Sequence, residues 1–474
     1  MSKQFLKKQC FPVLFCLLLL GSLACGSDDE PEEVVLPENP VFGTIRLRNQ
    51  AQIDSFGRLG YTSVENELLI GGTVSDPQTQ TITDLSPLSS LRKVSIFAIS
   101  GSTELSSLEG LENLTETLLF QVTALEAIED LNELNSIEKI QYLSIRNMPG
   151  LKSLNGLENM PNGPNTVDIF QCDNLSDISA LSTVTTMNNL NLHRLPLLTS
   201  LEGLQNLQSL NSFVITELPI PDLKELSSLQ SITSSFILEN NSSIESLTGL
   251  ENLSSINGLL QIRANDRLRN IDALRGISRI GSDLNILDNP VLNDFSGLRN
   301  LSLIGGNLRI QSSMSDFDAF SNLRSIGGHV QVTDSPGISD ARFFRSLENV
   351  GGGMSFNRCT SLTSFAGLEN LTKINGSLNI IDSNSLISLE GLSSLVHIDG
   401  ALQINRNPML RNLNHLSSLN HVSWSIYISE NTALTDLCGL KSFLESGYLG
   451  SDLLINSNGY NPVREDIISD NCRL

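Results

Sequence analysis

Apolar positions recur along most of this chain with a period of 22 to 24 residues. One unit follows L-x-x-L-x-x-I-x-G-x-L-x-I-x-x-N-x-x-L-x-x-L-x-G, and residues 368–392 show it nearly unchanged. Self-similarity of this kind predicts stacked supersecondary units rather than separate globular domains. The residue that opens L-x-x-L-x-x-I marks sixteen units, at Leu88, Leu111, Leu134, Leu157, Leu181, Leu204, Leu226, Leu250, Leu274, Leu298, Phe320, Phe344, Leu368, Leu392, Leu416 and Leu440.

Each unit contains one segment in which apolar and polar residues alternate, as in Leu378/Ile380, Leu402/Ile404 and Ile426/Ile428. Alternation with period two predicts a strand that is buried on one face. The three-residue spacing elsewhere in the unit suits tight turns or short 3-10 segments, and no unit has room for a long helix. A single unit cannot bury its own apolar face, so the sequence predicts a β-rich solenoid over residues 41–455 with a C-terminal cap over 456–474.

In most of the later units, the position three residues after the second apolar residue of the strand is polar or small. An amide that points inward at a turn can satisfy backbone groups of its own and the adjacent coil, so these residues are predicted to form a buried ladder. Cysteine suits the same position because it is small and usually buried. The predicted ladder residues are Cys172, Asn241, Asn265, Asn289, Ser313, Ser335, Cys359, Ser383, Asn407, Asn431 and Asn458.

This asparagine-or-cysteine ladder resembles that of leucine-rich repeats. The full 24-residue unit is similar to the receptor L-domain, a ligand-binding module that also occurs in long surface lipoproteins of Bacteroidota, and residues 43–72 resemble its N-terminal coil. The resemblance implies a right-handed superhelix of about sixteen coils with one long parallel sheet. It does not imply a particular ligand.

The N-terminus has the pattern of an export signal. Lys3, Lys7 and Lys8 precede a short apolar run over residues 11–20, and the run is too short to span a bilayer as a helix. The sequence at 23–25 resembles a bacterial lipobox, which implies a signal peptide over 1–24, a lipidated Cys25 and attachment to a membrane through that lipid. An ordinary secretory signal is the alternative, since Ser22 replaces the usual leucine.

Residues 25–40 continue the resemblance to exported lipoproteins. They are acidic and proline-rich, and with so few apolar side chains they are predicted to form a solvated tether. The acidic run at 27–30 resembles the sorting signal of surface-exposed Bacteroidota lipoproteins. The implied location is the outer membrane, with the solenoid exposed at the cell surface.

The remaining cysteines fall into two pairs with different predicted roles. Cys172 and Cys359 lie eight coils apart, on the order of 40 Å at one strand spacing per coil, so they cannot form a disulfide and are predicted to be buried thiols. Cys438 follows the last complete ladder unit and Cys472 lies near the C-terminus. A disulfide between them would hold a cap over the last coil of an exported chain, and two unpaired thiols are the alternative.

Charge and motifs restrict the possible functions. The formal net charge of −22 argues against nucleic acid as a partner. The five histidines show no H-E-x-x-H spacing, and the sequence has no G-x-S-x-G, Walker or C-x-x-C motif, so no catalytic residue, cofactor or metal site is predicted. The pairs Gly305-Gly306, Gly327-Gly328 and Gly351-Gly352 recur in coil register, which predicts turns with positive φ rather than phosphate loops.

Outward-facing strand positions form the predicted binding face. They carry mostly neutral hydrogen-bonding side chains, to which an exposed indole at Trp424 could add a binding anchor, unless it packs under the C-terminal cap. The hypothesis is a non-catalytic surface protein that binds an extracellular protein or polysaccharide. A structural spacer or envelope-assembly subunit is the alternative, and a polysaccharide-degrading enzyme would need clustered carboxylates that these columns lack. The candidate residues are Gln261, Asn285, Arg309, Gln331, Asn379, Gln403, Trp424 and Tyr427.

Overall fold

The structure, a computed structural model, describes residues 38–73, 75–315 and 318–474. Asn39–Leu474 form one compact unit. The predicted signal peptide, the lipidation residue Cys25 and nearly all of the predicted tether lie outside the described residues. In the part of the chain that is described, every helix is too short or too polar to span a bilayer.

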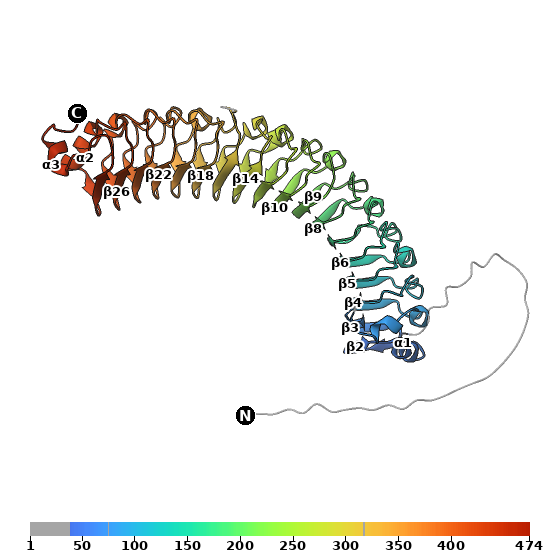
Figure 1. The fold of residues 1–474 in the computed structure, drawn as a ribbon. Helices are drawn as coiled ribbons and strands as arrows, with labels where there is room; N and C mark the ends of the chain where they lie inside the picture. The colour runs from blue at the N-terminus through green and yellow to red at the C-terminus, as the bar shows by residue number, and fades with distance from the viewer. Residues whose placement is uncertain (1–37, 74, 316–317) are drawn as a thin grey trace, which may run out of the picture. The chain divides into compact units, whose positions relative to one another are not determined.

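The compact unit is a solenoid in which each coil adds parallel strands to one continuous sheet (Figure 1). Strand residues pair with those about one repeat further along the chain, for example Phe97 with Phe120 and Leu378 with Leu402. The sheet lies on the inner side of the curved stack, and the turns and 3-10 segments lie on the outer side. The predicted fold class is therefore confirmed.

The coils before residue 240, which we call the N-terminal coils, mostly contain one long strand each. Two short strands precede them, and one helix, α1 (Gln50–Gly57), covers the first coil, where the Asn49 side chain accepts a hydrogen bond from the Gln52 backbone. The strands are β1 (Pro40–Val41), β2 (Thr44–Leu47), β3 (Ser63–Gly71), β4 (Lys93–Ser100), β5 (Glu116–Thr123), β6 (Lys139–Arg146), β7 (Thr166–Phe170), β8 (Thr186–His193), β9 (Ser209–Thr216) and β10 (Ser231–Glu239).

The coils after residue 240, which we call the C-terminal coils, each split the strand into two short pieces. The first pieces are β11 (Ser255–Ile256), β13 (Arg279–Ile280), β15 (Leu303–Ile304), β17 (Ser325–Ile326), β19 (Asn349–Val350), β21 (Lys373–Ile374), β23 (His397–Ile398), β25 (His421–Val422) and β27 (Tyr448–Leu449). The second pieces are β12 (Leu260–Arg263), β14 (Leu284–Asn289), β16 (Leu308–Ser312), β18 (Val330–Thr333), β20 (Met354–Asn357), β22 (Leu378–Ile381), β24 (Leu402–Asn405), β26 (Ile426–Ser429) and β28 (Leu453–Asn456).

One added residue precedes the split. The register between β9 and β10 shifts between Ile232 and Ser235, because β10 has one more residue there than β9. Every 24-residue coil that follows keeps this residue, which separates the two apolar positions that point inward, such as Ile256 and Leu260. With this residue the two positions are four apart, so both point to the same face in an extended strand. β10 carries the added residue and is still one strand, and the split begins in the next coil.

The turns on the outer side are of two types. Short 3-10 segments form one type, and the other type has a glycine with positive φ, such as Gly249 with φ +109°. In the N-terminal coils the two types alternate, with glycines Gly110, Gly156, Gly203 and Gly249 between successive 3-10 segments. The 3-10 segments are Thr79–Thr81, Ser86–Leu88, Asn132–Leu134, Ser179–Leu181, Lys224–Leu226, Asp272–Gly276, Ser296–Leu298, Arg342–Phe344, Asn414–Leu416 and Cys438–Leu440.

The predicted ladder positions lie inside the C-terminal coils. The Asn265 side-chain oxygen accepts from the Asn241 backbone at 3.1 Å, and its amide nitrogen donates to the Leu238 carbonyl at 3.1 Å. Asn407 and Asn431 repeat this arrangement, and all four of these asparagines are fully buried. Cys172 and Cys359 are buried free thiols. Burial raises the pKa of each to about 12.

Two details of the prediction are wrong. The ladder residue in the short coil after β14 is Ser312, which pairs with Asn289 and is buried, whereas Ser313 is exposed. The paired glycines do not adopt the left-handed conformation. They are small because the coils approach closely there: a Cβ on Gly305 would lie 2.1 Å from the Gly281 carbonyl oxygen. Positive φ occurs instead one residue before the ladder, as at Arg358 with φ 53°.

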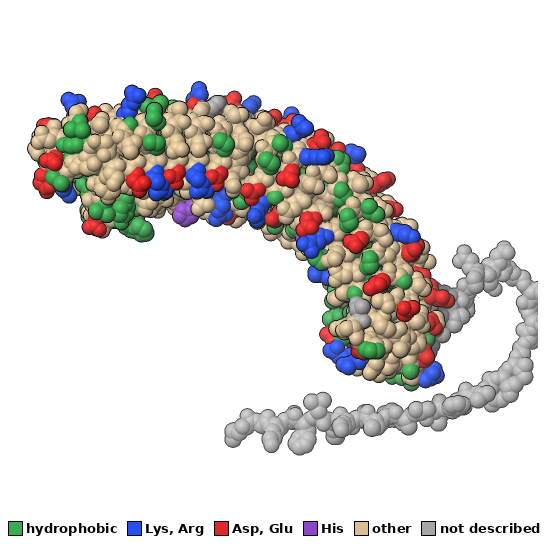
Figure 2. Space-filling view, viewed as in Figure 1, with side chains coloured by type: hydrophobic (Ala, Val, Ile, Leu, Met, Phe, Trp, Pro, Cys, Tyr) green, Lys and Arg blue, Asp and Glu red, His purple; other side chains and the backbone are tan. Residues whose placement is uncertain are grey.

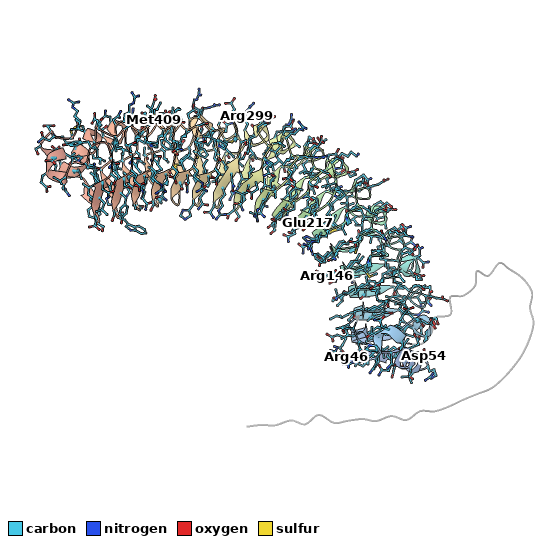
Figure 3. The ribbon with its side chains drawn as sticks, in the orientation of Figure 1. Arg46, Asp54, Arg146, Glu217, Arg299 and Met409 are labelled. Atoms are coloured by element: carbon cyan, nitrogen blue, oxygen red, sulfur yellow. A yellow bond between two sulfur atoms is a disulfide. The ribbon has the colours of Figure 1, made fainter. Side chains whose placement is uncertain are left out.

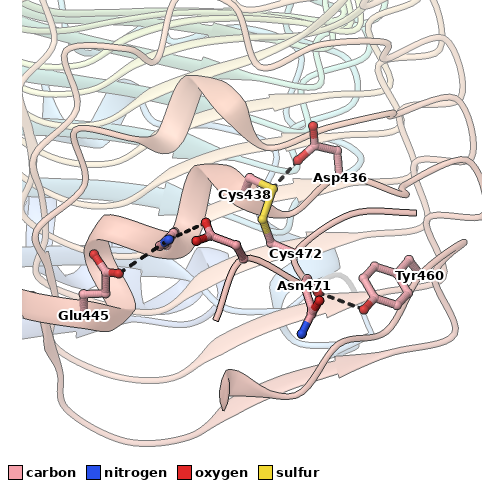
Figure 4. Close-up of a disulfide and its surroundings, with 8 residues drawn as sticks. Asp436, Cys438, Glu445, Tyr460, Asn471 and Cys472 are labelled. Atoms are coloured by element: carbon pink, nitrogen blue, oxygen red, sulfur yellow. Dashed lines mark hydrogen bonds and ion pairs between the residues drawn. A yellow bond between two sulfur atoms is a disulfide. The ribbon is translucent and has the colours of Figure 1, made fainter. Parts of the chain in front are cut away.

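A C-terminal cap closes the last coil (Figure 4). It contains α2 (Lys441–Ser446) and α3 (Arg464–Ile468), and a disulfide joins Cys438 to Cys472. The Cys438 backbone N–H donates to the Asp436 carboxylate at 2.9 Å, and the Tyr460 hydroxyl donates to the Asn471 carbonyl at 2.8 Å. The chain end is thus fixed over core residues that would otherwise face solvent.

Candidate binding face

Seven of the eight predicted face residues form a single column across the sheet. Each pairs with the next in strands β12 to β26, because every coil places the same outward position at the same height. The unbroken series, with Ser355 included, is Gln261, Asn285, Arg309, Gln331, Ser355, Asn379, Gln403 and Tyr427. Trp424 lies outside this column, three residues before Tyr427.

The first part of this column is a connected polar network. The Arg309 guanidinium donates to the Asn285 side-chain oxygen at 3.1 Å and to Gln331 at 3.2 Å, and Asn285 donates to Gln261 at 3.3 Å. Asn285 is only 7% exposed, so its neighbours cover it and it is not available as a free contact. Arg309 also pairs with Asp283 at 3.1 Å. Burial opposes ionisation of Asp283, but hydrogen bonds from Asn307 and Arg309 lower its pKa overall.

The central part of the column borders a hollow of about 220 Å³. Gln331, Ser355 and Asn379 line it together with His329, whose Nδ1 accepts from the Gly353 backbone at 2.8 Å. The side-chain oxygens of Asn357 and Asn379 are shielded from solvent and have no hydrogen-bond partner among the described residues. A buried acceptor without a partner costs free energy, so these two oxygens make this part of the sheet less favourable than its neighbours.

Aromatic side chains gather where this face meets the C-terminal cap. Trp424 is 62% exposed, so its indole does not pack under the cap. Tyr448 and Leu454 are also exposed, and Leu454 pairs with Tyr427 at the end of the column. Figure 2 shows a group of hydrophobic side chains projecting from the sheet side near this end. Exposed tryptophan and tyrosine are common anchors of binding sites.

The N-terminal coils carry a second polar cluster on the same side of the sheet, which the sequence analysis missed. Arg146 forms an ion pair with Asp168, and the Tyr142 hydroxyl donates to Asp168 at 3.4 Å. Asp168 is buried, so the arginine compensates a charge that would otherwise be costly. Burial and the adjacent Asp168 raise the pKa of Tyr142, and burial lowers the pKa of His193 nearby. Figure 3 shows Arg146 and Glu217 on the sheet side, opposite Arg299 and Met409.

A row of ion pairs runs beside the ladder of the C-terminal coils. Arg358 pairs with Asp334 at 2.5 Å and Arg406 pairs with Asp382 at 2.6 Å, and each arginine lowers the pKa of its partner. Acidic and basic side chains lie next to one another along this flank (Figure 2). Because these charges neutralise each other, the row favours neutral or mixed-charge partners over a strongly charged polymer.

A third group missed by the sequence analysis consists of His397, Asp399 and His421. A motif such as H-E-x-x-H joins residues that are close in sequence, whereas these three residues lie on adjacent coils. The signal was present as H-x-D at 397–399 and H-x-S at 421–423, which are 24 residues, or one coil, apart.

No protein-family model and no curated protein matches the sequence. Solved structures do match. A leucine-rich-repeat protein of Leptospira interrogans is 16% identical, with 90% of this chain and 97% of that chain covered and a TM-score of 0.41. An internalin of Listeria monocytogenes is 17% identical, covering 87% and 89%, with a TM-score of 0.33. A leucine-rich-repeat protein of Bacteroides eggerthii is 15% identical, covering 87% and 70%, with a TM-score of 0.35. At these identities and TM-scores the matches carry no argument about this chain, and its solenoid fold rests on the strand pairing described above.

Proposed function

We propose that this protein is a non-catalytic binding protein of the cell surface, and that the inner sheet face of its C-terminal coils binds an extracellular protein or polysaccharide. The observation that carries the proposal is the group of exposed side chains at the end of this face, Trp424, Tyr448 and Leu454, of which Trp424 is 62% exposed. Isolated surface apolar groups are common, but aromatic anchors at the end of a column of hydrogen-bonding side chains suit a bound ligand.

The rigidity of the face supports binding over a purely structural role. The column residues project from paired strands, and several are already held by hydrogen bonds to their neighbours. A preorganised surface loses little conformational entropy when it binds. A pure spacer would have no need of exposed aromatic groups at one end of this face.

The charge pattern argues against catalysis on this face. The carboxylates of Asp168 and Asp283 each pair with an arginine, and Asp334 and Asp382 do the same on the flank. Glycoside hydrolysis needs two free carboxyl groups on either side of one bond, about 5 to 9.5 Å apart. A polysaccharide-degrading activity is therefore the less favoured alternative.

The proposed location is the outer surface of the outer membrane, through a lipid on Cys25. The sequence of residues 1–30 supports it, and so does the Cys438–Cys472 disulfide, because such bonds persist in oxidising compartments. Labelling with radioactive palmitate tests the anchor: the wild-type chain should incorporate the label and Cys25→Ala should not. A labelled Cys25→Ala variant would overturn it.

The binding proposal is tested with soluble Asn39–Leu474, screened against arrays of extracellular glycans and proteins. For any ligand found, Trp424→Ala should weaken binding by at least about 30-fold, the loss expected for a binding anchor. Met409→Ala is the matched control, because Met409 is 46% exposed on the opposite side of the coils (Figure 3). Absence of any micromolar ligand, or equal losses in the two variants, would contradict the proposal.

A further inference from the structure

His397 and His421 occupy the same position on adjacent coils. They are direct register partners in β23 and β25, and their rings stack with centroids 3.9 Å apart and planes 8° from parallel. The Tyr448 ring stacks on the other side of His421 at 4.7 Å. Both imidazoles are half-buried, so the side chains are held in place while their edges stay accessible.

A carboxylate completes the group. Asp399 lies two residues after His397 on the same side of the chain, and its Oδ1 is 2.5 Å from the His397 Nε2. Its other oxygen, Oδ2, is 3.0 Å from the Lys373 ammonium. One ligand atom from each of His397, Asp399 and His421 can be chosen so that all three lie within 4.8 Å of one another.

We propose that His397, Asp399 and His421 form a binding site for one divalent transition-metal ion of the zinc type. Two imidazole nitrogens and one carboxylate oxygen suit zinc, copper or nickel, whereas calcium and magnesium require several oxygen ligands. Zinc–ligand distances are about 2.0–2.2 Å and imidazole binds through a lone pair in the ring plane, so the two stacked rings must tilt towards each other to surround one ion. The fourth position is open to water or to the hydroxyl of Ser423, which is 3.0 Å from the His421 Nε2.

Lys373 is a positioning residue in this site. Its bond to the outer oxygen of Asp399 leaves the inner oxygen directed at the imidazoles. Ligating carboxylates are usually held by such outer hydrogen bonds, and removing one typically weakens metal binding about 10- to 100-fold. The cysteines among the described residues do not compete for the ion, because Cys172 and Cys359 are buried and Cys438 and Cys472 are bonded to each other.

The test is a titration of tag-free Asn39–Leu474 with zinc chloride, followed by calorimetry, at neutral pH. One zinc ion should bind per chain, while calcium and magnesium chloride should give no heat of binding. His397→Ala and His421→Ala should each bind zinc at least about tenfold more weakly, and Asp399→Asn should do the same without changing the shape of the side chain. His415→Ala is the matched control: His415 is half-buried in the outer 3-10 turn Asn414–Leu416, away from the other two histidines, and the variant should bind zinc as the wild type does.

Cobalt(II) supplies a second readout, because its visible absorption reports the coordination of the bound ion. Its visible absorption should appear on binding to the wild type, with the intensity of a low-coordinate site, and should be absent in the double variant His397→Ala/His421→Ala. Circular dichroism establishes that each variant is folded. A dissociation constant above about 1 mM for the wild type, or unchanged zinc binding in the double variant, would overturn the proposal. Neither result bears on whether the sheet face binds a macromolecule.

Discussion

The N-terminal and C-terminal coils bury the same apolar strand positions, but they differ in the length of the strand and in the residue at the ladder position. In the N-terminal coils, one long strand such as β8 crosses the whole sheet face, and the ladder position is apolar, as at Met148, Leu195 and Leu218. In the C-terminal coils, the strand is split and the ladder position carries mostly asparagine or serine. The ladder changes at Asn241, just after β10, and the split begins one coil later, at β11 and β12.

The split coils also differ from the N-terminal coils between their two short strands. There the paired glycines of neighbouring coils meet closely. The backbone between the pieces still bonds from coil to coil, since the Gly305 N–H donates to the Ile280 carbonyl at 2.9 Å and the Gly306 N–H to the Ser282 carbonyl at 2.8 Å. At the other end of the coil, the Asn265 side chain bonds to the coils before and after it. The candidate binding face lies on these split coils.

Replacement of the ladder residue Asn265 by leucine, Asn265→Leu, should give the largest loss of stability. It inserts into a C-terminal coil the residue type that the N-terminal coils use, and it leaves the Asn241 backbone N–H and the Leu238 carbonyl buried without partners. At roughly 1–3 kcal/mol for each such group, the free energy of unfolding should fall by about 4 kcal/mol in urea denaturation.

The N-terminal counterpart of this swap is Leu195→Met, which keeps an apolar side chain and should cost less than about 1.5 kcal/mol. If Asn265→Leu cost no more than Leu195→Met, the ladder would not distinguish the two sets of coils.

The disulfide should give the next largest effect, because it constrains only the C-terminal end, whereas α1 covers the N-terminal end. The double variant Cys438→Ser/Cys472→Ser releases a link between residues 34 apart. Loop entropy predicts a loss of about 3–4 kcal/mol. Hydrogen exchange should accelerate in α2, α3 and β28 and stay unchanged in β4 to β6, and uniform acceleration throughout the chain would argue against a local cap.

The two types of outer turn, the glycine turn and the 3-10 turn, can be compared by matched substitutions. A Cβ at Gly249 would lie 1.9 Å from the Leu223 carbonyl oxygen, at a φ of +109° that other residues rarely adopt. Gly249→Ala should therefore lower the free energy of unfolding by about 3 kcal/mol. Ala273→Gly is the matched change at the same position of the following 3-10 turn, where it should cost about 1 kcal/mol or less. Equal losses would mean that the two turn types are interchangeable.

The smallest effect concerns pH. Burial lowers the pKa of His193 below the value of about 6.5 that it has in the unfolded chain. The unfolded state therefore binds a proton first, and stability should fall as the pH drops from 7 through 6.5 towards the folded pKa, then level off. The surrounding charges are Asp168, Arg146 and Glu217. His193→Asn should flatten this part of a plot of urea midpoint against pH, and an unchanged slope would contradict the assignment.

Periodicity was sufficient to predict the solenoid, because every coil repeats the same inward and outward positions. It failed where a coil departs from the common length: the 22-residue coil moves the ladder from Ser313 to Ser312. It also gave the wrong reason for the paired glycines, since contact between coils, rather than backbone conformation, requires them. The exposure of Trp424 and the meeting of His397 with His421 depend on the coil-to-coil register, which only the three-dimensional arrangement supplies. That the face binds a ligand, and that Cys25 carries a lipid, stay predictions.

The two buried thiols have a practical consequence. Cys172 lies in the N-terminal coils and Cys359 in the C-terminal coils, and burial keeps both protonated, with a pKa of about 12. An alkylating reagent can reach either sulfur only when its own part of the stack opens. Mass spectrometry of partially alkylated protein would thus report, without any engineered label, which of the two sets of coils opens first.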